Sequence, residues 1–182
     1  MITLNSDAAS TSLSKTTKAI LNEYGIKLNK NLGQNYLIDR NKRDQIIQFG
    51  NLTKDDVVLE IGPGIGTLTI ELAKRVKKVI AIEQDSNICQ ILENRLKKEN
   101  IDNVELINDD ALNVEFPKFD KIISNLPYQI SSPITFKFLN YDFQLAILMY
   151  QKEFASRMNG KVGSKDYSRL SACLLYTSPS PR

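Results

Sequence analysis

The sequence predicts an α/β domain built on a doubly wound, mostly parallel sheet. Short apolar runs of strand type alternate with stretches of helical periodicity, and this alternation implies parallel βαβ units with right-handed crossovers. The strand candidates are continuously apolar, as expected where helices cover both faces of a sheet. Ligands of such sheets bind at the carboxyl ends of the strands. The residues that follow each strand are therefore the first candidates for function.

The elements follow in a regular order from residue 57 onward. The predicted strands are 57–61, 79–83, 104–107, 121–124 and 145–150, with a sixth candidate at 168–175. The predicted helices are 17–24, a helix that starts after Asp39 as its N-cap, 67–75 and 86–98. Residues 1–16, rich in Ser, Thr and Ala, predict a flexible tail, and 17–176 a single domain. Residues 177–182 include Ser-Pro-Ser-Pro-Arg, which fits either a natural tail or a read-through or cloning scar.

Composition narrows the possible chemistry. The chain of 182 residues contains no histidine, which excludes histidine-based nucleophile activation and histidine metal ligands, and we expect no metal. No run approaches the roughly 20 apolar residues of a membrane span. Cys89 and Cys173 are far apart and predict reduced thiols in a cytoplasmic protein. Basic residues gather in two groups that suit either RNA or solvent: Lys15, Lys18, Lys27, Lys30, Arg40, Lys42 and Arg43, then Arg157, Lys161, Lys165 and Arg169.

A glycine-rich turn follows the first predicted strand. It places Gly62, Gly64 and Gly66 in a GxGxG pattern with Pro63 inside it. Glycine lets a backbone pass close to a ligand. The pattern departs from the GxGxxG fingerprint of dinucleotide sites, so a nucleoside with an amino-acid tail fits better than a pyrophosphate. A purely structural tight turn is the alternative.

Acidic residues follow the second and third strands. Glu83 stands where a carboxylate can accept both ribose hydroxyls of a nucleoside. An acid after the third strand can accept a hydrogen bond from an adenine amino group. Asp109 and Asp110 both qualify, and one of them could instead cap the next turn. We favour Asp110 for the adenine and Asp109 for solvent.

The fourth strand leads into the strip Asn125-Leu126-Pro127-Tyr128, the sharpest signal in the chain. The Asn125 side-chain oxygen and a backbone carbonyl at Leu126 can each accept one N–H of an amino group. The N6 lone pair of adenine is delocalised into the ring, and two acceptors favour a pyramidal nitrogen that can attack a methyl carbon. Tyr128 can stack on the base. The alternative is that the strip is only a structural turn after a strand, without a catalytic role.

Several segments together resemble the small-subunit rRNA adenine N6,N6-dimethyltransferases. The resemblance covers about residues 24 to 171, with Asp109 replacing a glycine and Tyr36 a phenylalanine. The matching segments are Leu32 to Asp39, Glu60 to Thr69, Glu83, Asp110 to Leu112, Asn125 to Tyr128, Gln151 to Arg157 and Tyr167 to Ser171.

The resemblance implies a Rossmann-like S-adenosylmethionine-dependent methyltransferase fold and an RNA substrate. Two neighbouring adenosines near the 3′ end of small-subunit rRNA would each be methylated twice. We expect a monomer that acts on immature small ribosomal subunits. The resemblance further implies contacts to the cofactor or the adjoining adenine from Asn35, Leu37, Gly62, Glu83, Asp110 and Asn125, with Gly64 and Gly66 in the same loop.

Family members continue into a helical RNA-binding domain, so we expect this chain to be truncated at its C-terminus. Two alternatives stay open. One is a large-subunit rRNA adenine N6-methyltransferase of the antibiotic-resistance type. The other is a ribosome-assembly factor that binds RNA without turnover. An NAD enzyme is disfavoured by GxGxG and by the Asn125 strip.

Overall fold

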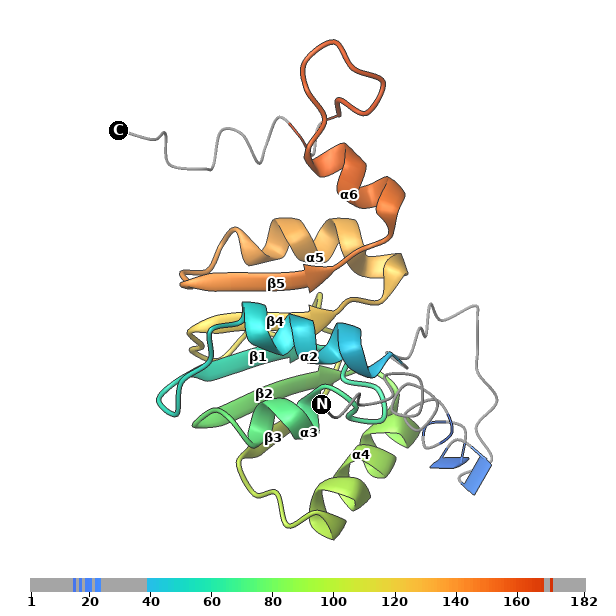
Figure 1. The fold of residues 1–182 in the computed structure, drawn as a ribbon, viewed down its shortest axis with the longest axis vertical. Coiled ribbons are helices and arrows are strands. Elements are labelled where there is room, and N and C mark those ends of the chain that lie inside the picture. The colour runs from blue at the N-terminus through green and yellow to red at the C-terminus, as the bar shows by residue number, and fades with distance from the viewer. Residues whose placement is uncertain are drawn as a thin grey trace, which may run out of the picture.

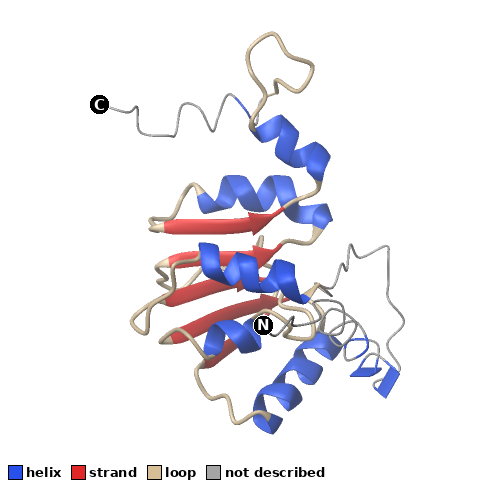
Figure 2. Ribbon diagram, in the orientation of Figure 1, coloured by secondary structure: helices blue, strands red, loops and turns tan. Residues whose placement is uncertain are grey.

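The sheet at the centre of the molecule has five parallel strands in the order β3-β2-β1-β4-β5. It belongs to a computed structural model that describes residues 39–168 together with residues 15, 17, 19, 20, 22, 23 and 171. All five strands end at the same side of the sheet (Figure 2). The predicted α/β fold with a parallel sheet is confirmed.

The elements have the following bounds. The strands are β1 (Val57–Ile61), β2 (Lys78–Glu83), β3 (Val104–Asn108), β4 (Lys121–Asn125) and β5 (Leu145–Met149). The helices are α2 (Arg40–Phe49), α3 (Thr69–Ala73), α4 (Ser86–Lys98), the 3-10 helix η2 (Tyr128–Ile130), α5 (Ser131–Phe138) and α6 (Lys152–Met158).

Several bounds differ from the sequence prediction. β2 begins one residue earlier, at Lys78, and β3 ends one residue later, at Asn108. The predicted helix 67–75 shrinks to α3, because residues 64–68 form turns around the glycines. β4 runs one residue further than predicted, because Asn125 still pairs with Met149 of β5. β5 ends at Met149 rather than at residue 150.

The sequence prediction also left out two helices. α5 was not predicted. Its Pro133 lies in the first turn, where a helix tolerates proline because no backbone N–H is needed there. α6 was missed as well. Of the predicted sixth strand, 168–175, only Ser168 and Ser171 are described, and neither lies in a strand.

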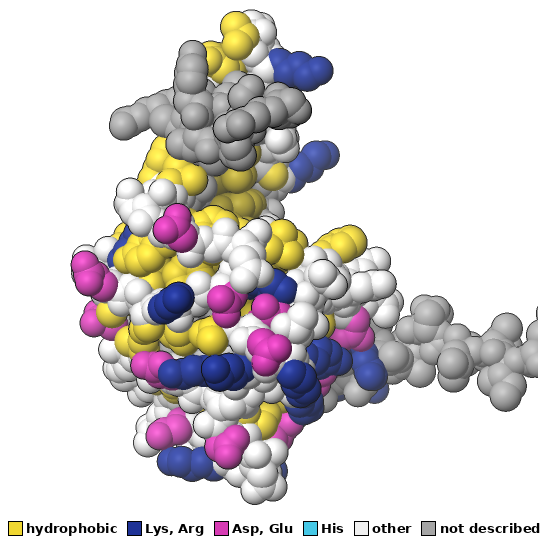
Figure 3. Space-filling model, turned by 90° about the vertical axis from the view of Figure 1, so that its left-hand side faces the viewer, with side chains coloured by type: hydrophobic (Ala, Val, Ile, Leu, Met, Phe, Trp, Pro, Cys, Tyr) yellow, Lys and Arg dark blue, Asp and Glu magenta, His cyan; other side chains and the backbone are white. Residues whose placement is uncertain are grey.

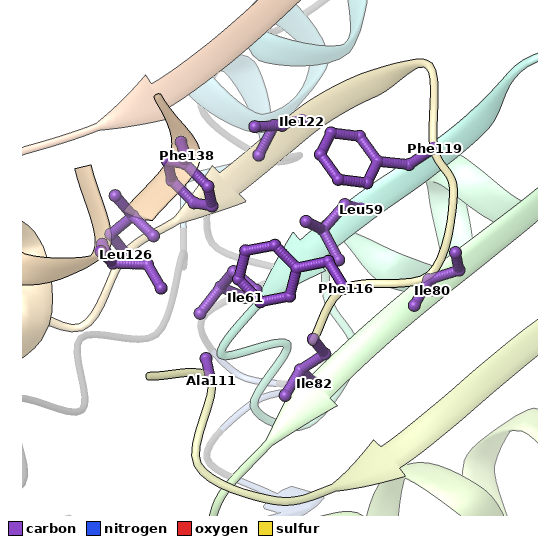
Figure 4. Packing of buried hydrophobic residues seen from close by; sticks show 11 residues of the cluster. Leu59, Ile61, Ile80, Ile82, Ala111, Phe116, Phe119, Ile122, Leu126 and Phe138 are labelled. Carbon is purple, nitrogen blue, oxygen red and sulfur yellow. The ribbon is translucent and has the colours of Figure 1, made fainter. Parts of the chain in front are cut away.

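Helices cover both faces of the sheet. On one face, α2 and α3 pack on Val58, Val79 and Ile123, and α4 joins them beside β3. On the other face, α5 and the segment between β3 and β4 enclose a second cluster that includes Leu59, Ile80, Phe116 and Phe138 (Figures 1 and 4). Neighbouring residues of each strand face opposite sides, so both faces are apolar and the strands read as unbroken hydrophobic runs.

Side-chain caps fix the starts of two helices. Asp39 caps α2 as predicted, because its carboxylate accepts the N–H groups of Asn41 (2.9 Å) and Lys42 (3.2 Å). Asp85 caps α4 in the same way. The described residues of the predicted helix 17–24 are helical, and Ile20 packs against Ile65 and Ile91.

The side of the sheet at which the strands begin carries charges of both signs, interspersed over its surface (Figure 3). Lys121 and Asp56 form a buried ion pair there, at 2.9 Å. No helix in the described part of the chain is long and apolar enough to cross a membrane.

Candidate active site at the carboxyl ends of the strands

The strand order reverses between β1 and β4, and the two strands part there. Their ladder joins Val58 to Lys121 and Leu59 to Ile122. Beyond it, the buried Ser124 hydroxyl replaces the ladder: Ser124 Oγ donates to Ile61 O (2.6 Å) and accepts from Ile61 N (3.2 Å). A side chain thus bridges the strands at the point where a parallel sheet opens to admit a ligand.

The glycine loop follows β1 directly. Gly62, Gly64 and Gly66 have φ angles of +66°, +55° and +84°, a region that other residues enter only with strain. Gly66 N–H donates to Pro63 O (3.0 Å) and closes the turn. The backbone geometry therefore favours glycine at all three positions, in agreement with the motif.

The glycine loop packs directly against the Asn125 strip. A β-carbon on Gly62 would lie 2.8 Å from Pro127 Cγ and 3.0 Å from Pro127 Cδ. Such a contact is too short for real atoms. The missing side chain at Gly62 is thus what lets the two sequence motifs meet.

Glu83 lies at the end of β2 and faces the same loop. Its Oε2 accepts the N–H of Gly64 (3.2 Å), and its Oε1 accepts the N–H of Asp85 (3.1 Å). Burial raises the pKa of Glu83 above its usual value, although these backbone hydrogen bonds oppose the rise. The carboxylate predicted to hold a ribose is therefore anchored beside the glycine loop.

Glu60 is a second acid of this region, in β1 just before the glycine loop. It is only 2% exposed, and burial, reinforced by the nearby Glu83 carboxylate, raises its pKa to about 8. Its Oε2 is buried without a hydrogen-bond partner in the described part of the chain, as is Thr69 Oγ1. Glu60 begins the segment Glu60 to Thr69 that carries the family resemblance, but it was not among the predicted site residues.

The two aspartates after β3 differ in their surroundings. Asp109 is exposed and Asp110 is half-buried. Asp110 Oδ1 accepts the N–H of Leu112 (2.9 Å), while Asp109 Oδ1 accepts that of Asp110 (2.7 Å). Asp110 thus caps a turn, which is the role that the sequence analysis left open for one of the two aspartates.

The Asn125 strip combines a strand end with a turn. Asn125 is the last residue of β4 rather than the first residue after it. Leu126 is 2% exposed and packs in the cluster beneath α5 (Figure 4), so only its backbone can serve a reaction. Pro127 is extended, with φ −60° and ψ 129°, and Tyr128 opens the 3-10 helix η2.

The structure brings most of the predicted site residues to one edge of the sheet. Gly64 contacts Glu83, Gly62 contacts Pro127, and the backbone N–H of Asp109 donates to Glu83 O (3.1 Å). Asn35 and Leu37 lie outside the described residues. Among the described residues, no cluster of His, Cys, Asp or Glu is arranged to hold a metal ion.

The two basic groups are only partly described. Lys18, Lys27, Lys30 and Arg169 lie outside the described residues. Arg43 is buried and pairs with Asp44 at 2.8 Å, so it is poorly placed to meet a phosphate. Arg157, Lys161 and Lys165 are exposed on and after α6.

Comparisons with known proteins identify the family of this chain. The family described as ribosomal RNA adenine dimethylase matches residues 25–178. The chain is 58% identical over 160 residues to a probable ribosomal RNA small subunit methyltransferase A of Methanosphaera stadtmanae, covering 88% of this chain and 59% of the relative. A protein of the same name from Methanothermobacter thermautotrophicus is 57% identical, with 85% and 56% covered. The chain therefore spans little more than half the length of these relatives.

Two solved structures share the fold. A dimethyladenosine transferase from Plasmodium falciparum is 43% identical, with a TM-score of 0.69 over 73% of this chain and 49% of that one. The 23S rRNA methyltransferase ErmE is 33% identical, with a TM-score of 0.66 over 79% and 57%. The match over most of the chain, with the glycine loop and the Asn125 strip in contact, establishes that the chain belongs to the ribosomal RNA adenine dimethylase family.

Proposed function

We propose that this chain carries the catalytic part of an S-adenosylmethionine-dependent rRNA adenine N6,N6-dimethyltransferase. Its substrate would be two adjacent adenosines near the 3′ end of small-subunit rRNA, methylated during ribosome biogenesis. One observation carries the proposal: Gly62 packs on Pro127, so the loop suited to a nucleoside cofactor and the strip suited to an adenine amino group share one edge of the sheet.

The described residues suit the proposed cofactor. The glycine loop offers a surface without side chains, and Glu83 and Asp110 offer carboxylates for ribose hydroxyls and an adenine amino group. The buried, unpartnered Oε2 of Glu60 adds a polar atom near the loop. Asn35, Leu37 and Asn125 complete the proposed contacts. The cofactor would supply a methyl group on a positively charged sulfur, already activated for transfer.

The residues of the chain would then orient the acceptor nitrogen. The Asn125 side-chain oxygen and the Leu126 carbonyl would each accept an N–H of the adenine amino group, which directs its lone pair toward the methyl carbon. Tyr128 would stack on the base, a contact worth about 1–3 kcal/mol. Transfer would form the N–C bond as the C–S bond breaks, and the proton of the nitrogen would pass to water. Fixed acceptors of this kind act by positioning and electrostatics.

Small-subunit rRNA is favoured over large-subunit rRNA by the pattern of similarity. The curated relatives quoted above carry small-subunit names, and identity is 43% to the dimethyladenosine transferase against 33% to ErmE. The exposed cations Arg157, Lys161 and Lys165 would contact RNA phosphates. We place the protein in the cytoplasm as a monomer. An RNA-binding assembly factor without turnover is the second candidate, and it would not need an intact Asn125 strip.

The proposal is tested by giving the protein labelled S-adenosylmethionine with unmodified small-subunit and large-subunit RNA in separate reactions. We expect label in small-subunit RNA, confined to two neighbouring adenosines. Label confined to large-subunit RNA would support the antibiotic-resistance type of enzyme. RNA binding without transfer would support the assembly factor. Either of these two results would refute the proposal.

A further inference from the structure

Lys137 of α5 makes an unusual set of contacts with the segment that follows β3. Its ammonium Nζ donates to the carbonyl oxygens of Ala111 (2.8 Å), Leu112 (3.1 Å) and Val114 (2.5 Å). An ammonium group has three N–H donors, so all three are engaged on one turn. Nζ also lies 4.4 Å from the centre of the Phe116 ring, which adds a cation–π contact.

These carbonyls belong to the turn that starts at Asp110. Asn113 and Val114 donate their N–H groups to Asp110 O (2.9 and 3.1 Å), so the chain completes one helical turn. A single turn has no following turn to supply donors for its last carbonyls. Lys137 supplies them, and a cation is favoured at that end of a helical turn. Asp110 caps the start of the turn, since its Oδ1 accepts from Leu112 N (2.9 Å).

α5 is fixed to the Asn125 strip at its other end. Its first residue, Ser131, donates through Oγ to Pro127 O (3.3 Å). Its last residue, Phe138, packs on Phe116 with ring centres 5.9 Å apart. Figure 4 shows Ala111, Phe116, Leu126 and Phe138 in one cluster. The helix therefore joins the turn of Asp110 to the strip.

We propose that Lys137 is a positioning residue that fixes the Asp110 turn, and with it the base end of the cofactor site, relative to the Asn125 strip. The identity of the ligand rests on the proposed function, but the link between Lys137 and the turn does not. Lys137 acts through Asp110 and need not touch a ligand. Nothing in the sequence separates it from the other lysines, because its partners are backbone carbonyls more than twenty residues away.

The test uses Lys137→Met, which keeps the length and apolar character of the stem and removes the three donors. Lys118→Met is the matched control, because Lys118 is an exposed lysine between β3 and β4. The dissociation constant of S-adenosylhomocysteine is measured by calorimetry. We expect about tenfold weaker binding for Lys137→Met, as for other residues linked in one hydrogen-bond network, and no change for Lys118→Met.

A double-mutant cycle separates positioning from a general loss of structure. Lys137→Met and Asp110→Asn should be strongly non-additive in their effects on binding, because both act on one turn. Lys137→Met and Glu83→Gln should be close to additive. Lys137→Arg keeps a cation and several donors, so it should bind with intermediate affinity, and it replaces Lys137→Met in the cycle if the latter does not fold.

Amide hydrogen exchange of residues 111–114 gives a readout without any ligand. Faster exchange there in Lys137→Met, but not in Lys118→Met, supports the proposal. Unchanged exchange and unchanged affinity in folded Lys137→Met would overturn it and leave the proposed function standing. Faster exchange in a protein whose parent does not bind S-adenosylhomocysteine would uphold the link to the turn and overturn the proposed function.

Discussion

Gly62 and Pro127 are in such close contact that a β-carbon on Gly62 would lie 2.8 Å from Pro127 Cγ. Gly62 and Pro127 are 65 positions apart in the sequence (127 − 62), and their contact joins the glycine loop to the Asn125 strip. A cofactor on one and an acceptor base on the other would be neighbours. The contact also leaves no room for a side chain at Gly62.

Gly62→Ala should therefore impair both stability and cofactor binding. The left-handed backbone costs a non-glycine residue about 1–2 kcal/mol, and overpacking against Pro127 adds about 1–3 kcal/mol. Gly163→Ala is the control, because Gly163 has a φ of +85° and nothing within 4 Å of its would-be β-carbon. Urea unfolding should show a clearly larger loss for Gly62→Ala. Equal losses would mean that the Pro127 contact is unimportant.

Ser124→Ala should weaken the link between β1 and β4 at the point where the two strands separate. The change removes both hydrogen bonds to Ile61 in a fully buried place, for a cost of about 1–3 kcal/mol. Ser132→Ala, at an exposed position of α5, should cost little. Thermal unfolding of the two variants measures the difference. A Ser124→Ala protein as stable as Ser132→Ala would show that the hydrogen bonds of the Ser124 hydroxyl do not contribute to stability.

Lys121→Met should destabilise the end of the sheet at which the strands begin, opposite the candidate site. Burial alone would raise the pKa of Asp56, but hydrogen bonds from Lys121 and Thr53 outweigh it and lower that pKa. Removing Lys121 leaves a buried unpaired carboxylate and should cost about 3–5 kcal/mol at neutral pH. Adding Asp56→Asn should recover part of the loss in chemical denaturation. A double variant less stable than Lys121→Met would argue against a buried ion pair.

Glu60→Gln should change how stability depends on pH. Glu60 stays protonated in the folded chain up to a pKa of about 8, against an ordinary 4.5 when unfolded. The unfolded chain therefore binds fewer protons between these values, and stability falls as pH rises from about 4.5 to 8. Glutamine does not titrate. Relative to the parent, Glu60→Gln should gain more than about 1 kcal/mol between pH 5 and pH 8.

Glu71→Gln is a control, because Glu71 should affect the pH dependence of stability in the opposite direction to Glu60. Burial would raise the pKa of Glu71, but hydrogen bonds from Arg75 and Lys74 lower it on balance. Its contribution to stability is present above pH 4.5 and is lost at lower pH. Urea titrations from pH 3 to pH 9 distinguish the two glutamates. A parent and a Glu60→Gln protein with parallel pH profiles would contradict the assignment for Glu60.

Local patterns predicted the parts of this fold that depend on local chemistry. The strands were predicted because burial on both faces makes them continuously apolar, and Asp39 was identified as a cap because its side chain bonds within three residues. α3 was overpredicted because the glycine turn takes up its first residues. The Gly62–Pro127 contact, the Ser124 bridge and the Lys137 contacts join distant segments, so no local pattern encodes them.

The central claim is that the Asn125 strip orients an adenine amino group for methyl transfer. It is tested most directly by nucleoside mass spectrometry of unmodified small-subunit RNA treated with S-adenosylmethionine and either the parent or Asn125→Ala, after calorimetry has matched the cofactor occupancy of the two proteins. The account predicts N6,N6-dimethyladenosine with the parent and at least about a hundredfold less with Asn125→Ala, as when one stabilising group of a catalytic site is removed. Equal yields from the two proteins, or none from a cofactor-loaded parent, would contradict it.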